Sequence, residues 1–176
     1  MLYIKNHPFP ELQTERLVLR QLQDNDASEI LRLRTDEQVN KYIYRPKAKG
    51  IDDAHNFIQR ITENTNNNIS AFWVLTSKHR PGFIGTILFW NIDNEKETAE
   101  IGYELLPEYQ GKGFMLEAAR SVIAYGFNNI KFKAIEACTH AQNDASIKLL
   151  GKLGFKHLPD SKPEENEAVF ILNADI

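Results

Sequence analysis

The chain has 176 residues, with 21 Lys and Arg against 24 Asp and Glu, which gives a formal net charge of −3. This length fits one domain with a hydrophobic core of its own, so we expect residues 1–176 to form a single domain. The charge balance and the lack of a basic run disfavour nucleic-acid binding. A single cysteine, Cys138, excludes a disulfide scaffold and makes the cytoplasm the expected location.

No segment approaches the ~20 consecutive apolar residues of a transmembrane helix, so we expect no membrane association. Acidic residues are concentrated in the second half of the chain, where residues 93–108 hold six acids and one lysine. We expect no metal cofactor. A homodimer is compatible with the sequence, which leaves the oligomeric state open.

The first part of the chain predicts one strand and three helical segments. Residues 14–22 alternate apolar and polar side chains, which is typical of a strand. Asp26 is an expected helix cap, with Glu29 completing a capping-box pattern. A short helical turn is expected at residues 39–43, and a longer helix begins near Asp52 as its cap. The apolar residues of that helix have the spacing of one face: Ala54, Phe57, Ile58 and Ile61.

Three strands with short connections follow, at residues 69–77, 83–91 and 99–106. Consecutive strands of this kind form an antiparallel meander. Trp73 and Trp90 lie within it, and we expect both to pack in the core or on a face of the sheet.

The hydrophobic period then changes to an alternation of helices and strands. Helices are expected at residues 114–127 and 145–153, and strands at residues 130–139, 155–158 and 168–173. A strand–helix–strand unit after a meander predicts an α/β domain with a mixed, mostly antiparallel sheet flanked by helices.

Residues 104–115 connect the third meander strand to a helix and contain two glycines, Gly111 and Gly113. Glycines let a ligand approach the main chain closely, and a helix N-terminus attracts an anion, so this turn favours a phosphate or pyrophosphate. A Walker A loop would need Ser or Thr where Gly113 stands, and a dinucleotide fingerprint would need Gly or Ala in place of Leu116. Glycines that only end a strand and start a helix are the alternative.

A second motif begins the last helix, Asn143-x-x-Ser146 followed by Lys152-Leu-Gly-Phe155. Together with Gln110-Gly-Lys-Gly-Phe-Met, it closely resembles the GNAT superfamily of acyl-CoA-dependent N-acetyltransferases. Two further segments, Thr-Glu-Arg-Leu-x-Leu-Arg from Thr14 and Ala-Glu-Ile-Gly-Tyr-Glu-Leu from Ala99, are similar to its RimJ/RimL-type branch. That branch includes enzymes that acetylate the N-terminal amine of ribosomal proteins. The resemblance covers residues 14–173.

The resemblance implies acetyl-CoA as co-substrate and a splayed strand where it binds. The pantetheine arm would pair with the backbone of Leu105 and Leu106, while Asn143 and Ser146 would lie near the thioester end. An Asn in this position also caps the helix, and the two roles are compatible. The pyrophosphate would bind the turn formed by Gln110, Gly111, Lys112, Gly113, Phe114 and Met115.

Direct attack of an amine on a thioester in a ternary complex needs a base for the amine and a proton for the departing thiol. Many GNAT enzymes donate that proton from a tyrosine seven residues after the motif asparagine, but this position is Leu150 here. The resemblance to RimL-type enzymes implies that Ser146 is the acid in its place. Glu100 is the first candidate for the base. The other candidates are Glu104, His140, Glu164 and Glu165.

The predicted function is transfer of an acetyl group to a primary amine, possible acceptors including the N-terminus of a ribosomal protein. A small-molecule amine, such as a polyamine or aminoglycoside, is the alternative acceptor. A non-catalytic acyl-CoA-binding module is the alternative outside the enzymes. We expect Cys138 to lie in the core. The basic residues 45–49 are expected to form a solvated loop, although the resemblance places this region beside the acceptor.

Overall fold

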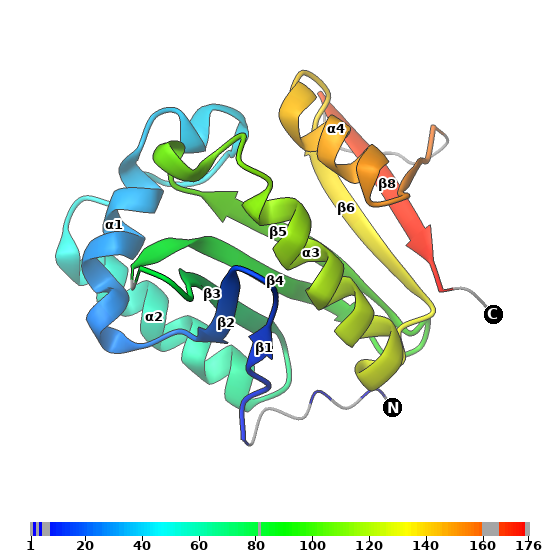
Figure 1. The fold of residues 1–176 in the computed structure, drawn as a ribbon, viewed down its shortest axis with the longest axis horizontal. Helices are drawn as coiled ribbons and strands as arrows, with labels where there is room; N and C mark the ends of the chain where they lie inside the picture. Colours follow the sequence, from blue (N-terminus) through cyan, green and yellow to red (C-terminus); the bar gives the residue numbers. More distant parts are fainter. Residues whose placement is uncertain (1, 3, 5–7, 81, 160–165, 175–176) are drawn as a thin grey trace.

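The protein is described here by a computed structural model that covers residues 2, 4, 8–80, 82–159 and 166–174. Its centre is one eight-stranded sheet with the order β1-β2-β3-β4-β5-β6-β8-β7 (Figure 1). Only β5 and β6 pair in parallel among the described strands, and the other neighbours are antiparallel. The predicted α/β fold with a mixed, mostly antiparallel sheet is confirmed.

The main helices and strands follow the predicted order, and the two-residue strand β1 is an addition to it. The strands are β1 (Leu12–Gln13), β2 (Leu17–Gln21), β3 (Ala71–Ser77), β4 (Phe83–Asp93), β5 (Thr98–Leu105), β6 (Ala134–His140), β7 (Lys156–His157) and β8 (Glu167–Asn173). The α-helices are α1 (Ala27–Thr35), α2 (Ile51–Asn66), α3 (Phe114–Tyr125) and α4 (Asp144–Lys152). Short 3-10 helices are η1 (Asp24–Asp26), η2 (Val39–Tyr42) and η3 (Pro107–Tyr109), and η4 (Gly126–Ile130) is a π-helical turn.

The helices divide between the two faces of the sheet. Helices α1 and α2 pack on one face, against Phe72 and Val74 of β3. Helices α3 and α4 pack on the other, where Trp73 and Leu75 of the same strand lie in the larger core. Alternate residues of a strand point to opposite faces, so each central strand contributes to both cores. None of the helices in the described residues is long and apolar enough to cross a membrane.

The two predicted helix caps have different outcomes. Asp26 stands at the N-cap position of α1 as predicted, but its side chain does not cap the helix, because its carboxylate accepts two hydrogen bonds from the Arg20 guanidinium and one from the Gln23 amide. Helix α2 begins two residues earlier than the Asp52 cap would require, with Gly50 at the N-cap position, so Asp52 lies in the first turn. Acidic residues still occupy these first turns, where they favour the helix dipole.

The connection from α3 to β6 also differs from the prediction. The helix continues as a π-helical turn from Gly126 to Ile130, and the strand begins only at Ala134. Lys131 adopts a left-handed conformation with φ of 73°, and Phe132 donates its amide to the Gly126 carbonyl. Ile130 and Phe132 are buried, so their apolar pattern reflects a packed connection and not strand pairing.

Gly85 on β4 allows β4 and β5 to approach each other. A Cβ atom at this position would lie 2.1 Å from the Glu104 carbonyl oxygen and 2.9 Å from the Leu105 Cα. Both are backbone atoms, so a side chain at position 85 would fit only if the backbone of β5 moved away. The strand that carries several predicted site residues therefore depends on this glycine for its position.

We expect Gly85→Ala to lower the free energy of unfolding by about 3 kcal/mol, the upper range for overpacking a core. Urea denaturation would measure this loss. Gly151→Ala is the matched control, because no heavy atom lies within 4 Å of the added Cβ and the residue is exposed on α4. Alanine in a helix should there stabilise the protein by roughly 0.5–1 kcal/mol. Equal effects of the two substitutions would contradict the close-approach argument.

Candidate functional site

Strands β5 and β6 separate shortly after they begin to pair. Their parallel pairing covers only Thr98↔Ala134, Ala99↔Ile135 and Glu100↔Glu136. Strand β5 continues to Leu105 and β6 to His140, and the two strands diverge over this length (Figure 1). The splayed strand expected from the resemblance is present.

The backbone of β5 beyond Glu100 presents alternate peptide groups to this divergence. Leu106 donates its amide to the Ile84 carbonyl and accepts from the Tyr109 amide, both at 3.0 Å. Because hydrogen-bonding groups alternate along an antiparallel strand, the groups directed away from β4 belong to Tyr103 and Leu105. In contrast to the prediction, Leu106 presents no backbone group to the space beside β6.

The glycine turn has the conformation that its sequence suggests. Gly111 and Gly113 have φ of 70° and 79°, in the left-handed region that favours glycine. Gly113 is the N-cap residue of α3, and no side chain of the described residues caps this helix. Both glycines and Lys112 are exposed. Unpaired amides at the positive end of α3 make this turn suitable for an anion.

The other predicted residues of the turn are divided between exposed and buried positions. Gln110 donates from Nε2 to the Leu105 carbonyl at 3.1 Å and accepts from Gln38 at 2.9 Å, so it ties the turn to the end of β5. Phe114 is half-buried, and Met115 is buried in the larger core. Met115 therefore offers only its backbone to a ligand at the turn.

Arg16 of the segment before β2 holds the glycine turn in place. Its Nη1 donates to the Lys112 carbonyl at 3.1 Å, and its Nε pairs with Glu117 Oε2 of α3 at 2.6 Å. Its guanidinium also lies 4.4 Å from the centre of the Phe114 ring. Thr14 adds a hydrogen bond to the same glutamate. The Thr-Glu-Arg segment thus has a structural role, because its hydrogen bonds and ion pair with Glu117 hold the start of β2 against the first turn of α3.

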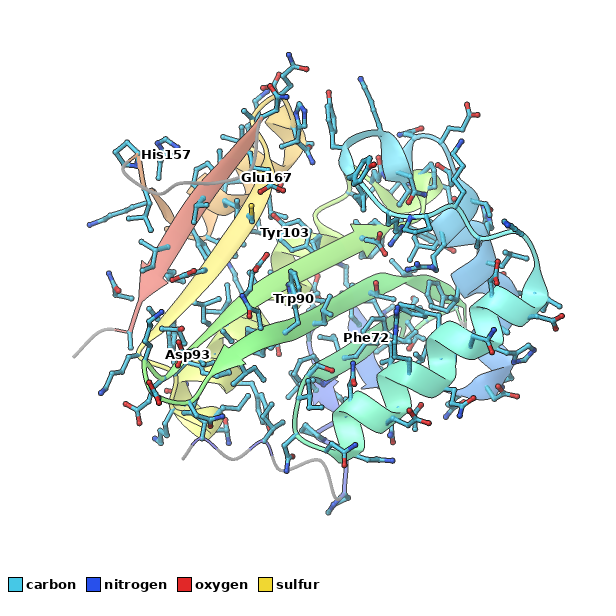
Figure 2. The ribbon with its side chains drawn as sticks, turned by 180° about the vertical axis from the view of Figure 1, so that it is seen from behind. Phe72, Trp90, Asp93, Tyr103, His157 and Glu167 are labelled. Carbon is cyan, nitrogen blue, oxygen red and sulfur yellow. The ribbon has the colours of Figure 1, made fainter. Side chains whose placement is uncertain are left out.

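Ser146 and Tyr103 contact each other on the face of the sheet that α3 and α4 cover, where β5 and β6 diverge. The Tyr103 and Ser146 hydroxyl oxygens are 2.7 Å apart, joining β5 to the first turn of α4. Asn143 accepts from the Ser146 amide at 3.2 Å and is the N-cap residue of α4, so its capping role is confirmed. Tyr103 lies between β5 and β6 in Figure 2. Leu150, at the position of the absent tyrosine, is fully buried in the core.

Glu100 lies on the opposite face of the sheet. It alternates with the buried Ala99 and Ile101 and projects toward the side of α1 and α2. Burial raises its pKa to about 7, and the nearby Glu136 and Glu167 add repulsion, while a hydrogen bond with Asn91 opposes the shift. A carboxyl with this pKa changes its protonation near neutral pH, as a general base requires.

Glu104, the second carboxylate on this face, is held by an ion pair. Its Oε1 lies 2.6 Å from Arg45 Nη1, and both side chains are only 16% exposed. Burial raises the Glu104 pKa, and the guanidinium groups of Arg45 and Arg34 act against that shift. The prediction of a solvated loop is therefore wrong for Arg45, which fastens the segment after η2 to β5.

Comparison with known proteins decides the family. The model of the acetyltransferase (GNAT) domain matches residues 16–156, most of the chain. The chain belongs to the GNAT family. It is an N-acetyltransferase of this type.

The sequence relatives agree with this assignment. The uncharacterized N-acetyltransferase YoaA of Bacillus subtilis (strain 168) is 34% identical over 148 residues, which are 84% of either chain. A ribosomal protein uS5-alanine N-acetyltransferase of Escherichia coli (strain K12) is 28% identical over 162 residues, 88% of this chain and 82% of that one. These names make the catalytically silent alternative the weaker one.

A solved structure shows the same fold at low identity. RimL, a ribosomal L7/L12 alpha-N-protein acetyltransferase in complex with coenzyme A, matches with a TM-score of 0.82 at 12% identity. The match covers 93% of this chain and 98% of that chain. The predicted GNAT fold is thereby confirmed.

The structure also places the other side chains that the sequence singled out. Trp90 is 46% exposed on the sheet face seen in Figure 2, so it takes the second of its two expected places, a face of the sheet and not the core. Cys138 is half-buried instead of core, and its Sγ donates to Glu167 Oε2 at 3.2 Å. His140 stacks against Tyr42 and accepts from the Gln142 amide. Two of the candidate bases, Glu164 and Glu165, lie outside the described residues.

Sequence reasoning missed Tyr103 and Arg16 as individual residues, although both stand in the segments that resemble the RimJ/RimL-type branch. A polar residue at a core-facing strand position was the available signal for Tyr103, because Ala99, Ile101 and Leu105 share its face. No local signal connects Arg16 to Glu117, which is 101 residues away.

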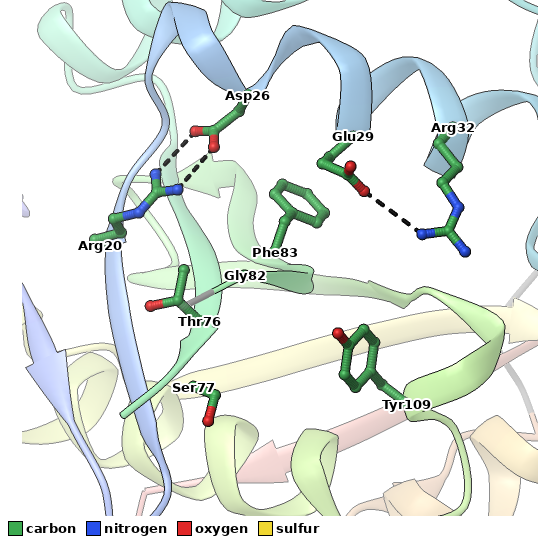
Figure 3. A pocket seen from close by; sticks show the side chains of 9 residues that line it. All are labelled: Arg20, Asp26, Glu29, Arg32, Thr76, Ser77, Gly82, Phe83 and Tyr109. Carbon is green, nitrogen blue, oxygen red and sulfur yellow. Dashed lines mark hydrogen bonds and ion pairs between the residues drawn. The ribbon is translucent and has the colours of Figure 1, made fainter. Parts of the chain in front are cut away.

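A cavity of about 510 Å³ lies apart from this GNAT site, between α1 and the adjoining ends of β2, β3 and β4. Arg20 and Asp26 on its wall form a bidentate ion pair, and Glu29 pairs with Arg32 (Figure 3). Tyr109 lines it from the segment after β5, but none of the predicted site residues does. Its paired charges leave no net charge to attract a charged ligand.

Proposed function

We propose that this N-acetyltransferase uses acetyl-CoA and acetylates the N-terminal amine of a protein. The observation that carries the proposal is the divergence of β5 and β6. The Tyr103 and Ser146 hydroxyls lie on one face of the sheet there, and Glu100, at the last paired position before the divergence, lies on the other face. Donor and acceptor substrates can then meet between the strands from opposite faces of the sheet. The protein-N-terminal acceptor is supported by the name of the Escherichia coli relative.

The residues of the chain fit the pyrophosphate of CoA. A Cβ at Gly111 would have no heavy atom within 4 Å, and one at Gly113 would approach only Arg16, at 3.5 Å. The exposed turn thus has open space beside both glycines, and Lys112 adds a positive charge. We assign the pyrophosphate to Gln110, Gly111, Lys112, Gly113, Phe114 and Met115. The pantetheine arm is assigned to the β5 edge that includes Leu105.

Acetyl-CoA supplies an activated acetyl group and a thiol that can leave. An α-amino group has a pKa of about 8, so a base near neutral pH can remove its proton without a large energetic cost. Glu100 accepts that proton on the face of α1 and α2. Ser146 donates a proton to the departing thiol on the face of α3 and α4. The chain needs no covalent acetyl-enzyme, because the two substrates react directly in a ternary complex.

The face around Glu100 favours a cationic acceptor. Glu136 and Glu167 lie close enough to raise the Glu100 pKa by repulsion, and Trp90 is exposed on the adjacent strand. Carboxylates attract an ammonium group, and an indole face binds cations. A polyamine carries the same positive charge as a protein N-terminus, so this face does not distinguish the two acceptors and turnover must be measured with both.

Release of CoA thiol would be measured with three acceptor panels: peptides with free N-termini, polyamines and aminoglycosides. We expect peptides with free N-termini to be acetylated and the same peptides with blocked N-termini to be inert. Faster turnover of polyamines or aminoglycosides than of peptides would show that the acceptor is a small molecule and not a protein N-terminus. Tight CoA binding without acetylation of any acceptor in the three panels would contradict the proposal that the protein is catalytically active.

Ser146→Ala should lower kcat by roughly 100-fold, in the range that general acid catalysis contributes, and leave the Kd for CoA within about 3-fold. Ser28→Ala is the matched control, because Ser28 is exposed on α1, the opposite face from α4. Steady-state kinetics and calorimetry give the two quantities. Unchanged turnover in Ser146→Ala would remove this hydroxyl from the reaction.

A further inference from the structure

The contact between Tyr103 and Ser146 joins two elements that no local sequence signal connects. Their hydroxyl oxygens are 2.7 Å apart, although the residues are 43 positions apart in the chain. Tyr103 projects from β5 toward α4, at the part of β5 that no longer pairs with β6. Ser146 stands in the first turn of α4, where Asn143 fixes its backbone amide. The pair therefore lies on the edge of the proposed path for the thioester.

The relative acidity of the two hydroxyls sets the direction of this hydrogen bond. A phenol has a pKa near 10, whereas an alkyl hydroxyl such as that of serine is a much weaker acid. The stronger acid is the better donor, so the Tyr103 O–H donates to Ser146 Oγ. A serine hydroxyl carries one hydrogen, and that hydrogen is then left for a different acceptor. Tyr103 thereby determines where Ser146 can donate.

We propose that Tyr103 is a positioning residue for acetyl transfer: by donating to Ser146 Oγ, it directs the serine hydrogen toward the sulfur that leaves the acetyl group. The inference rests on the proposed role of Ser146 as proton donor. A chain of two hydrogen bonds polarises both hydroxyls, so the serine donates more strongly than it would alone. Tyr103 acts through Ser146 and does not itself touch the sulfur.

The step balances in atoms and charge. The amine nitrogen forms a bond to the acetyl carbon, and the carbon–sulfur bond breaks with its electron pair moving to sulfur. Glu100 takes the first proton from the ammonium form of the acceptor and passes it to solvent, and it then takes the second proton that the nitrogen loses as the amide forms. The sulfur receives the Ser146 proton, the serine recovers one from Tyr103, and the phenol recovers one from solvent. No oxidant, reductant or further reactant is required.

The surroundings of Tyr103 keep its phenol a donor at neutral pH. Burial raises the Tyr103 pKa, and the bond with Ser146 only partly opposes this shift. The charged groups of this site, Glu100 and the Glu104–Arg45 pair, project to the opposite face of the sheet. The direction of the hydrogen bond therefore stays the same throughout the working pH range.

The test uses binding, which needs no acceptor. Calorimetry would give the affinity of the full-length protein for CoA and for desulfo-CoA, in which hydrogen replaces the thiol, between about pH 7 and pH 9.5. A hydroxyl donated to sulfur stabilises the thiolate, because hydrogen bonds to charged groups are the stronger ones. In the wild type, we expect the CoA affinity relative to desulfo-CoA to rise about 10-fold over this range.

Tyr103→Phe should abolish most of this rise while leaving the desulfo-CoA affinity within about 2-fold of the wild type. Ser146→Ala should do the same, and the double variant should be no worse than either single variant. Tyr125→Phe, which removes a half-buried phenol from α3, is the matched control and should behave as the wild type.

The inference would be overturned by no rise in the wild type, by a full rise in Tyr103→Phe, or by additive losses in the double variant. A fall in desulfo-CoA affinity equal to the fall in CoA affinity would instead show a purely structural role and also reject it. Failure of the proposed function is seen separately, as absence of acetyl transfer to every acceptor panel.

Discussion

Replacing Gly113 by aspartate is expected to weaken CoA binding by more than about 100-fold while the protein stays folded. The carboxylate would stand at the N-terminus of α3, where the proposed site receives a pyrophosphate. Two like charges about 4 Å apart repel by about 4 kcal/mol at the effective dielectric constant of a protein surface. The new Cβ has room, since its nearest neighbour is Arg16 Nη2 at 3.5 Å. Calorimetry with CoA would measure the loss.

The positive φ of Gly113 makes an uncharged control necessary. Gly113→Asn introduces the same shape and the same φ of 79° without the charge, and asparagine tolerates this conformation better than most residues. We expect Gly113→Asn to lose about 10-fold or less in affinity, and both variants to melt within a few degrees of each other. Retained affinity in Gly113→Asp would mean that the pyrophosphate binds elsewhere. Equal losses in both variants would assign the effect to backbone strain.

Replacing Glu100 by glutamine is expected to lower kcat roughly 100-fold at neutral pH, in the range that a general base contributes. Because the Glu100 pKa is raised to about 7, wild-type kcat/KM should increase as pH rises through that value. The variant should lose this increase but keep the dependence on ionisation of the acceptor amine, which both proteins share. Rate measurements across pH with one peptide acceptor would separate the two contributions.

The same substitution should change stability in a pH-dependent way. The Glu100 pKa is raised from 4.5 to about 7 on folding, so the folded chain binds the proton more tightly than the unfolded chain. Its contribution to stability is complete below about pH 4.5 and is lost as pH rises through 7. The melting temperature of Glu100→Gln relative to the wild type should therefore increase between about pH 5 and pH 8.

Glu95→Gln is the control for both measurements, because Glu95 is an exposed carboxylate in the turn between β4 and β5. It should alter neither kcat nor the pH dependence of the melting temperature. Wild-type turnover in Glu100→Gln would show that another group is the base. The next candidate is not Glu104, because Arg45 pairs with one oxygen of its carboxylate at 2.6 Å.

Much of the fold was predictable because its signals are local. The alternation in the meander strands and the one-face spacing of α2 each arise within a few residues, and the structure confirms these elements. Helix ends were less predictable. Asp26 has the residue type of a cap, but Arg20 from the neighbouring strand competes for its carboxylate. The strand before Ala134 was wrong because Ile130 and Phe132 are buried without pairing in the sheet.

The sequence by itself determined the family resemblance and made the form of the glycine turn possible, because glycine adopts the left-handed φ of Gly111 and Gly113 without steric cost. The tertiary structure alone decided the neighbours of the reacting groups. Strand divergence brings Tyr103 to Ser146, and loop packing brings Arg45 to Glu104. Burial and repulsion across β5, β6 and β8 raise the pKa of Glu100. Such contacts join residues tens of positions apart, so no periodicity or spacing in the chain encodes them.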